Sequence, residues 1–442
     1  MRSPVALLLD VASPARLGRP FRPLLGAVLV MNLGDGVVVA AGPLLTAALT
    51  RDPFLVSLAF LCENLPALLF GTVAGVVVDR QDRRMIAIAV NLARAVVLAI
   101  LAVTIVTHTV GIPVVLGSLL LLGTAETFGD IATSSLLPRL VPRSGLGIAN
   151  ARLQGGYILT NQLVGPPIGA FLFVVAPSMP FIGDAVCYVL GAVLIARIAA
   201  SSAAARTPAP ATDAAAEPGA DGDADGFEVE EPPSTTILHD LIEGARWLRH
   251  HAAMRTLVLT IVAFNVTFGA AWSVLVLYSS EQLGMDSVGF GLLTTAGAIG
   301  GAIGTVSYGA LERRFSLGNI MRVGLVIETF THLTLALTHS PAVALVIMTV
   351  FGAHAFVWGT TATAIRQRAV PDHLMGRISG IYRVGVFGGL VAGTPIGGLL
   401  ARQLGIAAPF WFGFVGSAIL VVLLWRQFAH IAHDGEDEAA TA

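Results

Sequence analysis

Charge is scarce in this chain. Only 12% of the 442 residues are charged, lysine is absent, and all 26 basic residues are arginine. Soluble domains carry about twice that charged share. Hydrophobic residues instead make up 55% of the chain, and the mean hydropathy is +0.79. This composition excludes an ordinary water-soluble protein and indicates a chain that lies in a membrane. The net charge of −2 points to no particular partner.

Cysteines and the common catalytic motifs are also scarce. Cys62 and Cys187 both lie inside apolar runs, where free thiols pack as small hydrophobic groups. The sequence has no P-loop, no HExxH or GxSxG pattern and no cluster of Cys and His. We therefore expect no metal, no cofactor and no enzymatic activity. Any work that the protein does must draw on a gradient, because the chain has no ATP motor of its own.

The apolar residues are organised in long runs. Segments of about 20 apolar residues, enough to cross a bilayer core of roughly 30 Å, recur from end to end. They predict an all-α integral membrane protein with twelve transmembrane helices. We expect the first six at 22–48, 54–78, 85–107, 112–137, 149–175 and 179–199, and the second six at 254–279, 288–311, 317–338, 341–365, 375–401 and 407–428. No cleaved signal peptide is expected, because the first apolar run is too long for one.

The predicted helices group into two pseudo-symmetric six-helix bundles, at 1–200 and 253–430. The segment 201–236 between them is acidic and rich in Ala and Pro. It is predicted to be a disordered cytoplasmic linker, because it has too little apolar surface to offset the entropy of ordering, and its charge does not suit nucleic acid. We expect an amphipathic helix at 237–252 to lie along the membrane surface, and an acidic cytoplasmic tail at 431–442.

Arginines concentrate on one side of the predicted membrane. They precede the first helix and follow the second, fourth, sixth, eighth and tenth, whereas the other side has little beyond Arg51 and Arg402. Cytoplasmic loops carry the excess of basic residues in membrane proteins. Both termini and the central linker are therefore predicted to be cytoplasmic.

The two halves repeat each other. GTVAGVVVDRQDRR at 71–84 has a counterpart in GTVSYGALERR at 304–314, and GPPIGA at 165–170 has one in GTPIGG at 393–398. The matching segments run in the same direction across the membrane. The halves are therefore expected to be parallel repeats related by an axis along the membrane normal, an arrangement found in transporters.

The charged end of the first repeat carries a motif with the spacing G-x-x-x-D-R-x-x-R-R, in which Asp82 stands where a glycine is usual; its members are Gly75, Asp79, Arg80, Arg83 and Arg84. Through this motif the chain resembles the major facilitator superfamily over essentially its whole length. Through NLGDG in the first helix and DAVCYVLGA in the sixth, it looks most like the group that contains the enterobactin exporter and bacterial macrolide and multidrug efflux proteins.

The resemblance implies a monomer in the bacterial cytoplasmic membrane that interacts with lipids, protons and a small-molecule substrate. It also implies that the carboxylate at the Asp79 position accepts hydrogen bonds from the positive N-terminal end of the eleventh helix. With its arginines it would act as a latch on the cytoplasmic side. A second family pattern, G-P-x-x-G-G, is typical of antiporters and is matched by Gly165, Pro166 and Gly169, with Ala170 in the last place.

Ionisable groups inside the spans are the best pointers to function, because each is costly in hydrocarbon unless paired or hydrated. Asp35 lies near the middle of the first helix, and Glu63 lies near mid-depth in the second, before Pro66. Each is a candidate proton carrier or substrate contact. The alternatives are that Asp35 is bonded to Asn32 and nearby backbone, and that Glu63 is a packing acid paired with an arginine.

Further candidates lie on the third, fourth and eleventh predicted helices. Glu126 and Asp130 are one turn apart and share a helix face, so either could pair with Arg94 in a structural or a coupling role. Arg383 has no obvious acid in its own half. It is a candidate for binding an anionic substrate or for pairing with Asp35 or Glu63 across a cavity.

Three more titratable residues lie inside spans of the second half, Glu328, His332 and His354. Histidine titrates near physiological pH, but a single membrane histidine is more often a hydrogen-bonded packing residue, and that is the interpretation adopted for these two. Asp184 lies near the outer end of the sixth helix.

These observations predict a secondary active transporter that exports amphipathic or hydrophobic small molecules, such as drugs or siderophores, by proton antiport and alternating access. A lipid or lysolipid carrier or a metabolite importer of the same fold is the alternative within transport. A transport-inactive membrane sensor or scaffold is the alternative outside it.

Overall fold

The computed structural model describes residues 17–18, 20–204 and 237–430, and within these ranges it contains helices and no strand. The predicted all-α membrane fold is confirmed. Most of the predicted linker, from residue 205 on, and the predicted tail at 431–442 lie outside the described residues.

The N-terminal half, residues 20–204, follows the predicted order of six spans. Its elements are α2 (Phe21–Leu49), α3 (Pro53–Arg80), α4 (Arg83–Val106), α5 (Ile112–Ser134), α6 (Leu137–Leu140), α7 (Leu146–Tyr157), η3 (Ile158–Val164), α8 (Gly165–Val175) and α9 (Met179–Ala204). Polar residues start several of these helices. Asp52 accepts a hydrogen bond from the Phe54 amide at the start of α3, and Asp82 accepts one from the Arg84 amide at the start of α4, because the first amides of a helix have no partner inside it.

The C-terminal half, residues 252–430, repeats this pattern after the separate helix α10 (Ile237–His250). Its elements are α11 (Ala252–Trp272), α12 (Leu275–Glu281), α13 (Ser287–Arg314), α14 (Leu317–Leu337), α15 (Pro341–Ala369), α16 (Met375–Leu404), α17 (Ala408–Leu424) and α18 (Gln427–His430). Eleven helical segments of the described chain are long and apolar enough to cross a membrane, and α17 is a shorter apolar helix that follows them.

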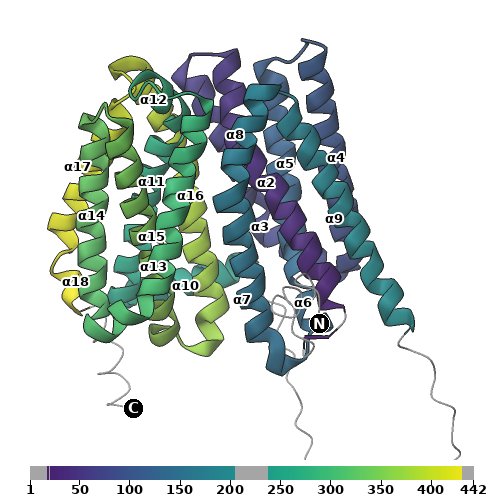
Figure 1. Cartoon of the computed structure of the whole chain (residues 1–442). Coiled ribbons are helices and arrows are strands. Elements are labelled where there is room, and N and C mark those ends of the chain that lie inside the picture. Colours follow the sequence, from purple (N-terminus) through teal and green to yellow (C-terminus); the bar gives the residue numbers. More distant parts are fainter. Residues whose placement is uncertain (1–16, 19, 205–236, 431–442) are drawn as a thin grey trace, which may run out of the picture.

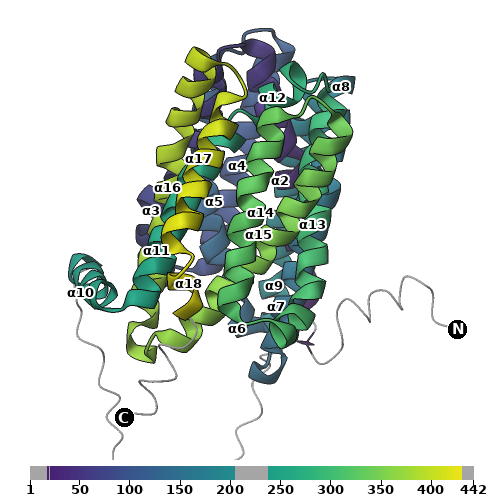
Figure 2. The ribbon, with the colours of Figure 1, turned by 90° about the vertical axis from the view of Figure 1, so that its left-hand side faces the viewer.

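The two halves stand side by side with their helices roughly parallel (Figures 1 and 2). We call the lower end of the molecule in Figure 1 the arginine-rich end, because α3, α13 and α15 finish there with arginines in their last turns. The upper end is the arginine-poor end. Between the halves, α3 packs against α16 and α8 packs against α13. These two helix pairs form the main contact between the halves.

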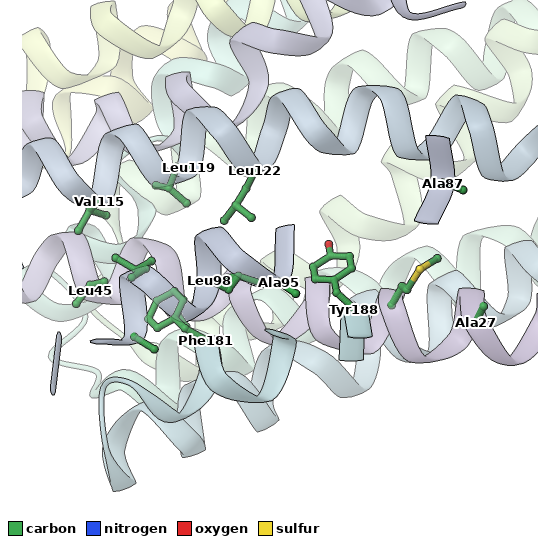
Figure 3. Packing of buried hydrophobic residues seen from close by; sticks show 14 of the residues in the cluster. Ala27, Leu45, Ala87, Ala95, Leu98, Val115, Leu119, Leu122, Phe181 and Tyr188 are labelled. Carbon is green, nitrogen blue, oxygen red and sulfur yellow. The ribbon is translucent and has the colours of Figure 1, made fainter. Parts of the chain in front are cut away.

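The N-terminal half is held together by an apolar core between α2, α4, α5 and α9. Leu98, Phe181 and Tyr188 are fully buried in it, and Figure 3 shows Tyr188 lying close to Leu98 and Ala95. Large side chains from four helices interlock here, and their close packing stabilises the half. Between helices in lipid the gain comes mainly from such close packing. The core therefore fixes the helices that carry the ionisable groups.

Two predicted helices have interruptions that the apolar runs do not show. The stretch predicted as one helix at 149–175 contains the π-helical turn η3 immediately before Pro166 and Pro167. Proline has no amide hydrogen to donate, and widened turns of this kind occur often at functional sites. The stretch predicted as one helix at 254–279 breaks between α11 and α12, at Ser273 and Val274.

Candidate functional site

The antiporter-type pattern at the start of α8 holds that helix against the middle of α2. A Cβ atom on Gly165 would lie 2.6 Å from the Gly36 Cα atom, and one on Gly169 would lie 2.9 Å from the Val37 Cα atom. Only glycine permits this approach, because a side chain would overlap the backbone of α2. The contact lies directly next to Asp35, so the pattern determines where that carboxylate sits.

Asp35 forms the centre of a polar cluster in the N-terminal half. Its Oδ1 atom accepts a hydrogen bond from the Arg94 Nη2 atom on α4 at 2.9 Å and another from the hydroxyl group of Tyr188 on α9. The same Arg94 nitrogen lies 3.5 Å from the Glu126 Oε2 atom on α5. The Arg94 guanidinium also lies over the Tyr188 ring, 4.2 Å from its centroid, where it gains a cation–π contact. One buried arginine therefore joins four helices.

Two members of this site were not among the predicted site residues. Asp184 is 2% exposed, and its Oδ1 atom has no hydrogen-bond partner in the described structure. Tyr188 is fully buried and bonds to Asp35. The two residues are one turn apart on α9 and so share a helix face. The signal in the sequence was therefore the four-residue spacing of Asp184 and Tyr188, which places two polar side chains on one face of an apolar helix.

A cavity of about 180 Å³ lies among these side chains. Its acidic lining residues are Asp35, Glu63, Glu126 and Asp184, and its basic lining residue is Arg94. A buried carboxylate without a counter-charge is strongly unfavourable. With one guanidinium facing four carboxyl groups, the cavity is suited to holding protons on its acids.

A second cavity, of about 210 Å³, lies between the two halves, and we call it the inter-half cavity. Glu63 and Asn64 on α3 line it from one side, and Trp272 and Phe290 line it from the other. Most of its remaining lining is aliphatic. Glu63 borders both cavities and has no ion-pair partner among the described residues. The acid cluster and the inter-half cavity therefore meet at one carboxyl group.

The other predicted residues lie at the margins of this site. Asp130 is exposed, one turn from Glu126 toward the arginine-rich end, and it forms no ion pair with Arg94 within the described part of the chain. Arg383 on α16 lies over the Phe387 ring, 5.8 Å from its centroid. No ion pair links it to Asp35 or Glu63 among the described residues. Both Arg94 and Arg383 act electrostatically on Asp130. Asn32 donates a hydrogen bond to the Val28 carbonyl. The side-chain hydrogen bonds to Asp35 come instead from Arg94 and Tyr188.

The charged motif lies at the arginine-rich end. Asp79 is 67% exposed and pairs with Arg83 of its own half at 2.7 Å. The Arg84 guanidinium donates to the Ala196 carbonyl at 2.7 Å and so connects α4 to α9. Asp82, which departs from the usual glycine, begins α4 as its N-cap. Arg80 is exposed, and a Cβ atom on Gly75 would meet no atom within 4 Å.

Close contacts between the halves occur at the arginine-poor end. Asp52 of the first half lies 3.6 Å from Arg402 of the second, as an ion pair. A Cβ atom on Gly398 of α16 would lie 2.9 Å from the Phe54 Cα atom of α3. At the arginine-rich end, by contrast, the ion pairs among described residues stay within one half, as with Asp79 and Arg83. The two halves are therefore joined at the arginine-poor end, and at the arginine-rich end Asp79 forms no ion pair with the other half among the described residues.

Comparisons with known proteins agree with this architecture. The family model described as Major Facilitator Superfamily matches residues 24–389 and 257–440. The chain is 25% identical over 420 residues to the multidrug efflux pump Tap of Mycolicibacterium fortuitum, covering 92% of this chain and 94% of that protein. It is also 25% identical over 418 residues to multidrug resistance protein 1 of Bacillus subtilis strain 168, covering 92% and 96%.

A solved structure has the same fold. The crystal structure of a bacterial homologue of the iron transporter ferroportin in an inward-facing state superimposes with a TM-score of 0.67, covering 93% of this chain and 98% of that one. The two sequences are 16% identical, so the likeness concerns the fold alone. No group of three or more His, Cys, Asp and Glu residues suited to a metal ion occurs in the described part of the chain.

Proposed function

The chain belongs to the Major Facilitator Superfamily, a family of membrane transporters, and from this membership we propose that it exports amphipathic small molecules in exchange for protons. One observation carries the proposal. The acid cluster around Arg94 has more carboxyl groups than basic partners, and it adjoins the inter-half cavity at Glu63. A substrate and a proton could therefore compete for the same carboxyl group.

The excess of acids supports the choice of protons as the coupling ion. Asp35 and Glu126 share Arg94, whereas Glu63 and Asp184 have no basic partner among the described residues. Protonation removes the cost of these unpaired charges without any change in the fold. A cationic substrate that enters the inter-half cavity would neutralise Glu63 in the place of a proton. Competition of this kind is the simplest basis for antiport.

The lining of the inter-half cavity supports the choice of substrate. Aliphatic and aromatic side chains surround Glu63 and Asn64 there, which suits a molecule with an apolar body and a positive or hydrogen-bonding group. One relative is named a multidrug efflux pump and the other a multidrug resistance protein, and drug-like molecules are the class of substrate proposed here. Asp35 and Glu63 are the proposed coupling residues, with Arg94 holding Asp35 in place.

The contacts between the halves support alternating access. The arginine-rich end is proposed to face the cytoplasm, as the distribution of basic residues indicates. In the arrangement described above, substrate would enter from that side. Closure would bring Asp79 to the N-terminal end of α16, where the helix dipole favours a negative charge, and would separate Asp52 from Arg402. Both termini would then lie in the cytoplasm.

Transport by proteoliposomes tests the proposal. The probe is ethidium, a permanently charged cation, because a weak base would accumulate passively in acidic vesicles. Vesicles with an acidic interior are mixed with ethidium, and the trapped dye is measured after gel filtration. We expect accumulation that disappears when the pH gradient is collapsed. Asp35→Asn should abolish this accumulation, because the amide cannot exchange a proton.

Matched controls separate the possible outcomes. Asp286→Asn makes the same chemical change at an exposed residue outside both cavities; asparagine can keep the cap that Asp286 gives to α13, so this variant should leave accumulation unchanged. Ethidium transport that ignores the pH gradient would refute proton antiport. Native rates in the Asp35→Asn protein would refute the assignment of the coupling site. The absence of both binding and flux with cationic and neutral probes would favour a sensor or scaffold.

A further inference from the structure

A second cluster of titratable groups lies in the C-terminal half, away from the site described above. Glu328 on α14 is 1% exposed. Its Oε1 atom is 3.0 Å from the Nε2 atom of His332, one turn later on the same helix, and its Oε2 atom is 3.2 Å from the Nε2 atom of His354 on α15. Each carboxylate oxygen thus has its own imidazole partner. We call these three residues the buried triad.

The charges on the surrounding helices lie far from the triad. Helix α17 has no acidic or basic residue, and α11 carries only Arg255, in its first turn. On α14, Arg322 precedes Glu328 by six residues, about 9 Å of helix, and its guanidinium donates to the Trp425 carbonyl. On α15, Arg366 and Arg368 lie in the last turn, about 18 Å or more beyond His354. The charged residues of α13 likewise lie in its last turn.

The triad must therefore balance its own charge. With both imidazoles neutral, an ionised Glu328 leaves a net charge of −1 in a buried site. With one added proton, the site is neutral overall. An uncompensated buried charge is far more costly than a hydrogen-bonded neutral pair. The composition of the triad thus makes it a site for one proton.

The second ring nitrogens leave room for this proton. The Nδ1 atoms of His332 and His354 are both buried and have no hydrogen-bond partner in the described structure. The imidazole ring of His332 lies against the backbone of Gly413 on α17, and the Nδ1 atom of His354 faces Gly324. Each imidazole can therefore gain or lose a proton without giving up its bond to Glu328. The protonation state can change while the helix packing stays intact.

One aromatic side chain separates the triad from the inter-half cavity. Trp272 lines that cavity, and its ring meets the His332 ring in an edge-to-face contact with centroids 6.1 Å apart. Phe268 and Phe351 pack on the same indole, with ring centroids 4.4 and 4.5 Å away. An occupant of the cavity that touches Trp272 is thus one side chain away from the triad.

We propose that Glu328, His332 and His354 form a second proton-binding site, which exchanges one proton with water in the inter-half cavity when Trp272 moves aside. Uptake of the proton changes the triad from a net charge of −1 to neutral, and release restores the negative charge. The role in transport rests on the proposed antiport function. The existence of the proton site does not, because the geometry of the triad is independent of any substrate.

A transport measurement tests the coupling role. Each proton exchanged per substrate multiplies the limiting accumulation about tenfold for every pH unit of gradient, since a tenfold ratio corresponds to about 1.4 kcal/mol. With a one-unit gradient, Glu328→Gln should lower ethidium accumulation about tenfold relative to the native protein. It should keep ethidium exchange between the two sides when no gradient is imposed. The matched control, Glu281→Gln at an exposed position, should behave as native.

A spectroscopic measurement tests the proton site without any substrate. An imidazolium next to an indole quenches its fluorescence, so protonation of His332 should dim Trp272. The fluorescence difference between the native protein and Trp272→Phe is followed from pH 5 to pH 9. We expect a step in this difference that is absent in His332→Asn and retained in His339→Asn, a matched change at an exposed histidine.

The results distinguish this inference from the proposed function. If the native protein ignores the pH gradient but shows the fluorescence step, antiport fails and the proton site stands. If native transport is driven by the gradient and Glu328→Gln accumulates ethidium as native does, the coupling role of the triad is overturned. If no fluorescence step is lost in His332→Asn, the proton site itself is overturned, even where Glu328→Gln does not fold.

Discussion

Gly398 lies where α16 crosses α3 near the arginine-poor end, and replacing it with valine should open that end. A Cβ atom there would overlap the Ser57 hydroxyl group and would lie 2.9 Å from the Phe54 Cα atom. Carbon atoms in good contact are about 3.5–4.0 Å apart, so the backbone of α3 would have to move. Overpacking of this kind costs about 1–3 kcal/mol.

We expect the cost to fall on the conformation that is closed at this end, because α16 and α3 touch at Gly398 there. A penalty of about 1–3 kcal/mol on the state closed at the arginine-poor end shifts the balance between the two states about 5- to 150-fold. The comparison variant is Gly380→Val on the same helix, because a Cβ atom on Gly380 would meet no atom within 4 Å. That variant should leave the closed end as it is.

Electron paramagnetic resonance distances between two spin labels measure the shift. The labels are attached at Arg51→Cys and Leu404→Cys, both exposed at the arginine-poor end, after Cys62 and Cys187 have been replaced with serine. Gly398→Val should add or enlarge a population at longer distance, and Gly380→Val should not. If the distance distribution of Gly398→Val matches that of the native protein in folded, monodisperse samples, close packing at Gly398 does not hold this end shut.

Two further variants test the charges at the site and at the closed end. Arg94→Gln leaves two carboxylate partners unpaired, so the free energy of unfolding should fall by about 3–5 kcal/mol at pH 8. The loss should be smaller at pH 6, because protonation removes the unpaired charges. An equal loss at both pH values, measured by thermal unfolding, would contradict this account. Asp52→Asn keeps the helix cap but removes the ion pair with Arg402, a side chain that is 57% exposed. Exposed pairs contribute about 0–1 kcal/mol, so the label distances should shift less than with Gly398→Val. In 1 M salt, where charges are screened, native and variant should converge, and a shift that survives high salt would point to a different cause.

The fold could be read from the sequence because a bilayer imposes simple rules. The apolar runs follow from the cost of placing polar groups in hydrocarbon, and they led to the correct fold class and order of spans; the arginine placement predicts the orientation in the membrane. The interruptions could not be read in this way. The π-helical turn before Pro166 and the break at Ser273 lie inside apolar segments and do not change their hydropathy. The apolar pattern therefore does not predict them.

The site was only partly predictable for a related reason. The positions of Asp35, Glu63 and Arg94 inside spans marked them as unusual, since each is costly there. Their partners depend on which helix faces lie together, and no periodicity within one helix contains that information. Tyr188 was missed for this reason. His354 was interpreted as a hydrogen-bonded packing residue, and its partner Glu328 lies on the preceding helix of the same half, which the sequence of α15 alone does not show.

The two clusters occupy related places in the duplicated fold. In the first half, Arg94 on the third span pairs with Glu126 on the fourth, and in the second half, Glu328 on the third span bonds to His354 on the fourth. The polar contact between these two spans is therefore present in both repeats, but the basic partner differs. Arginine keeps its charge, whereas an imidazole can be either neutral or charged. The first cluster can change its charge only through its acids, and the second cluster can also change it through its imidazoles. A transport cycle in which both halves bind protons from the same gradient would then have two separate proton-binding sites, one next to Glu63 and one behind Trp272.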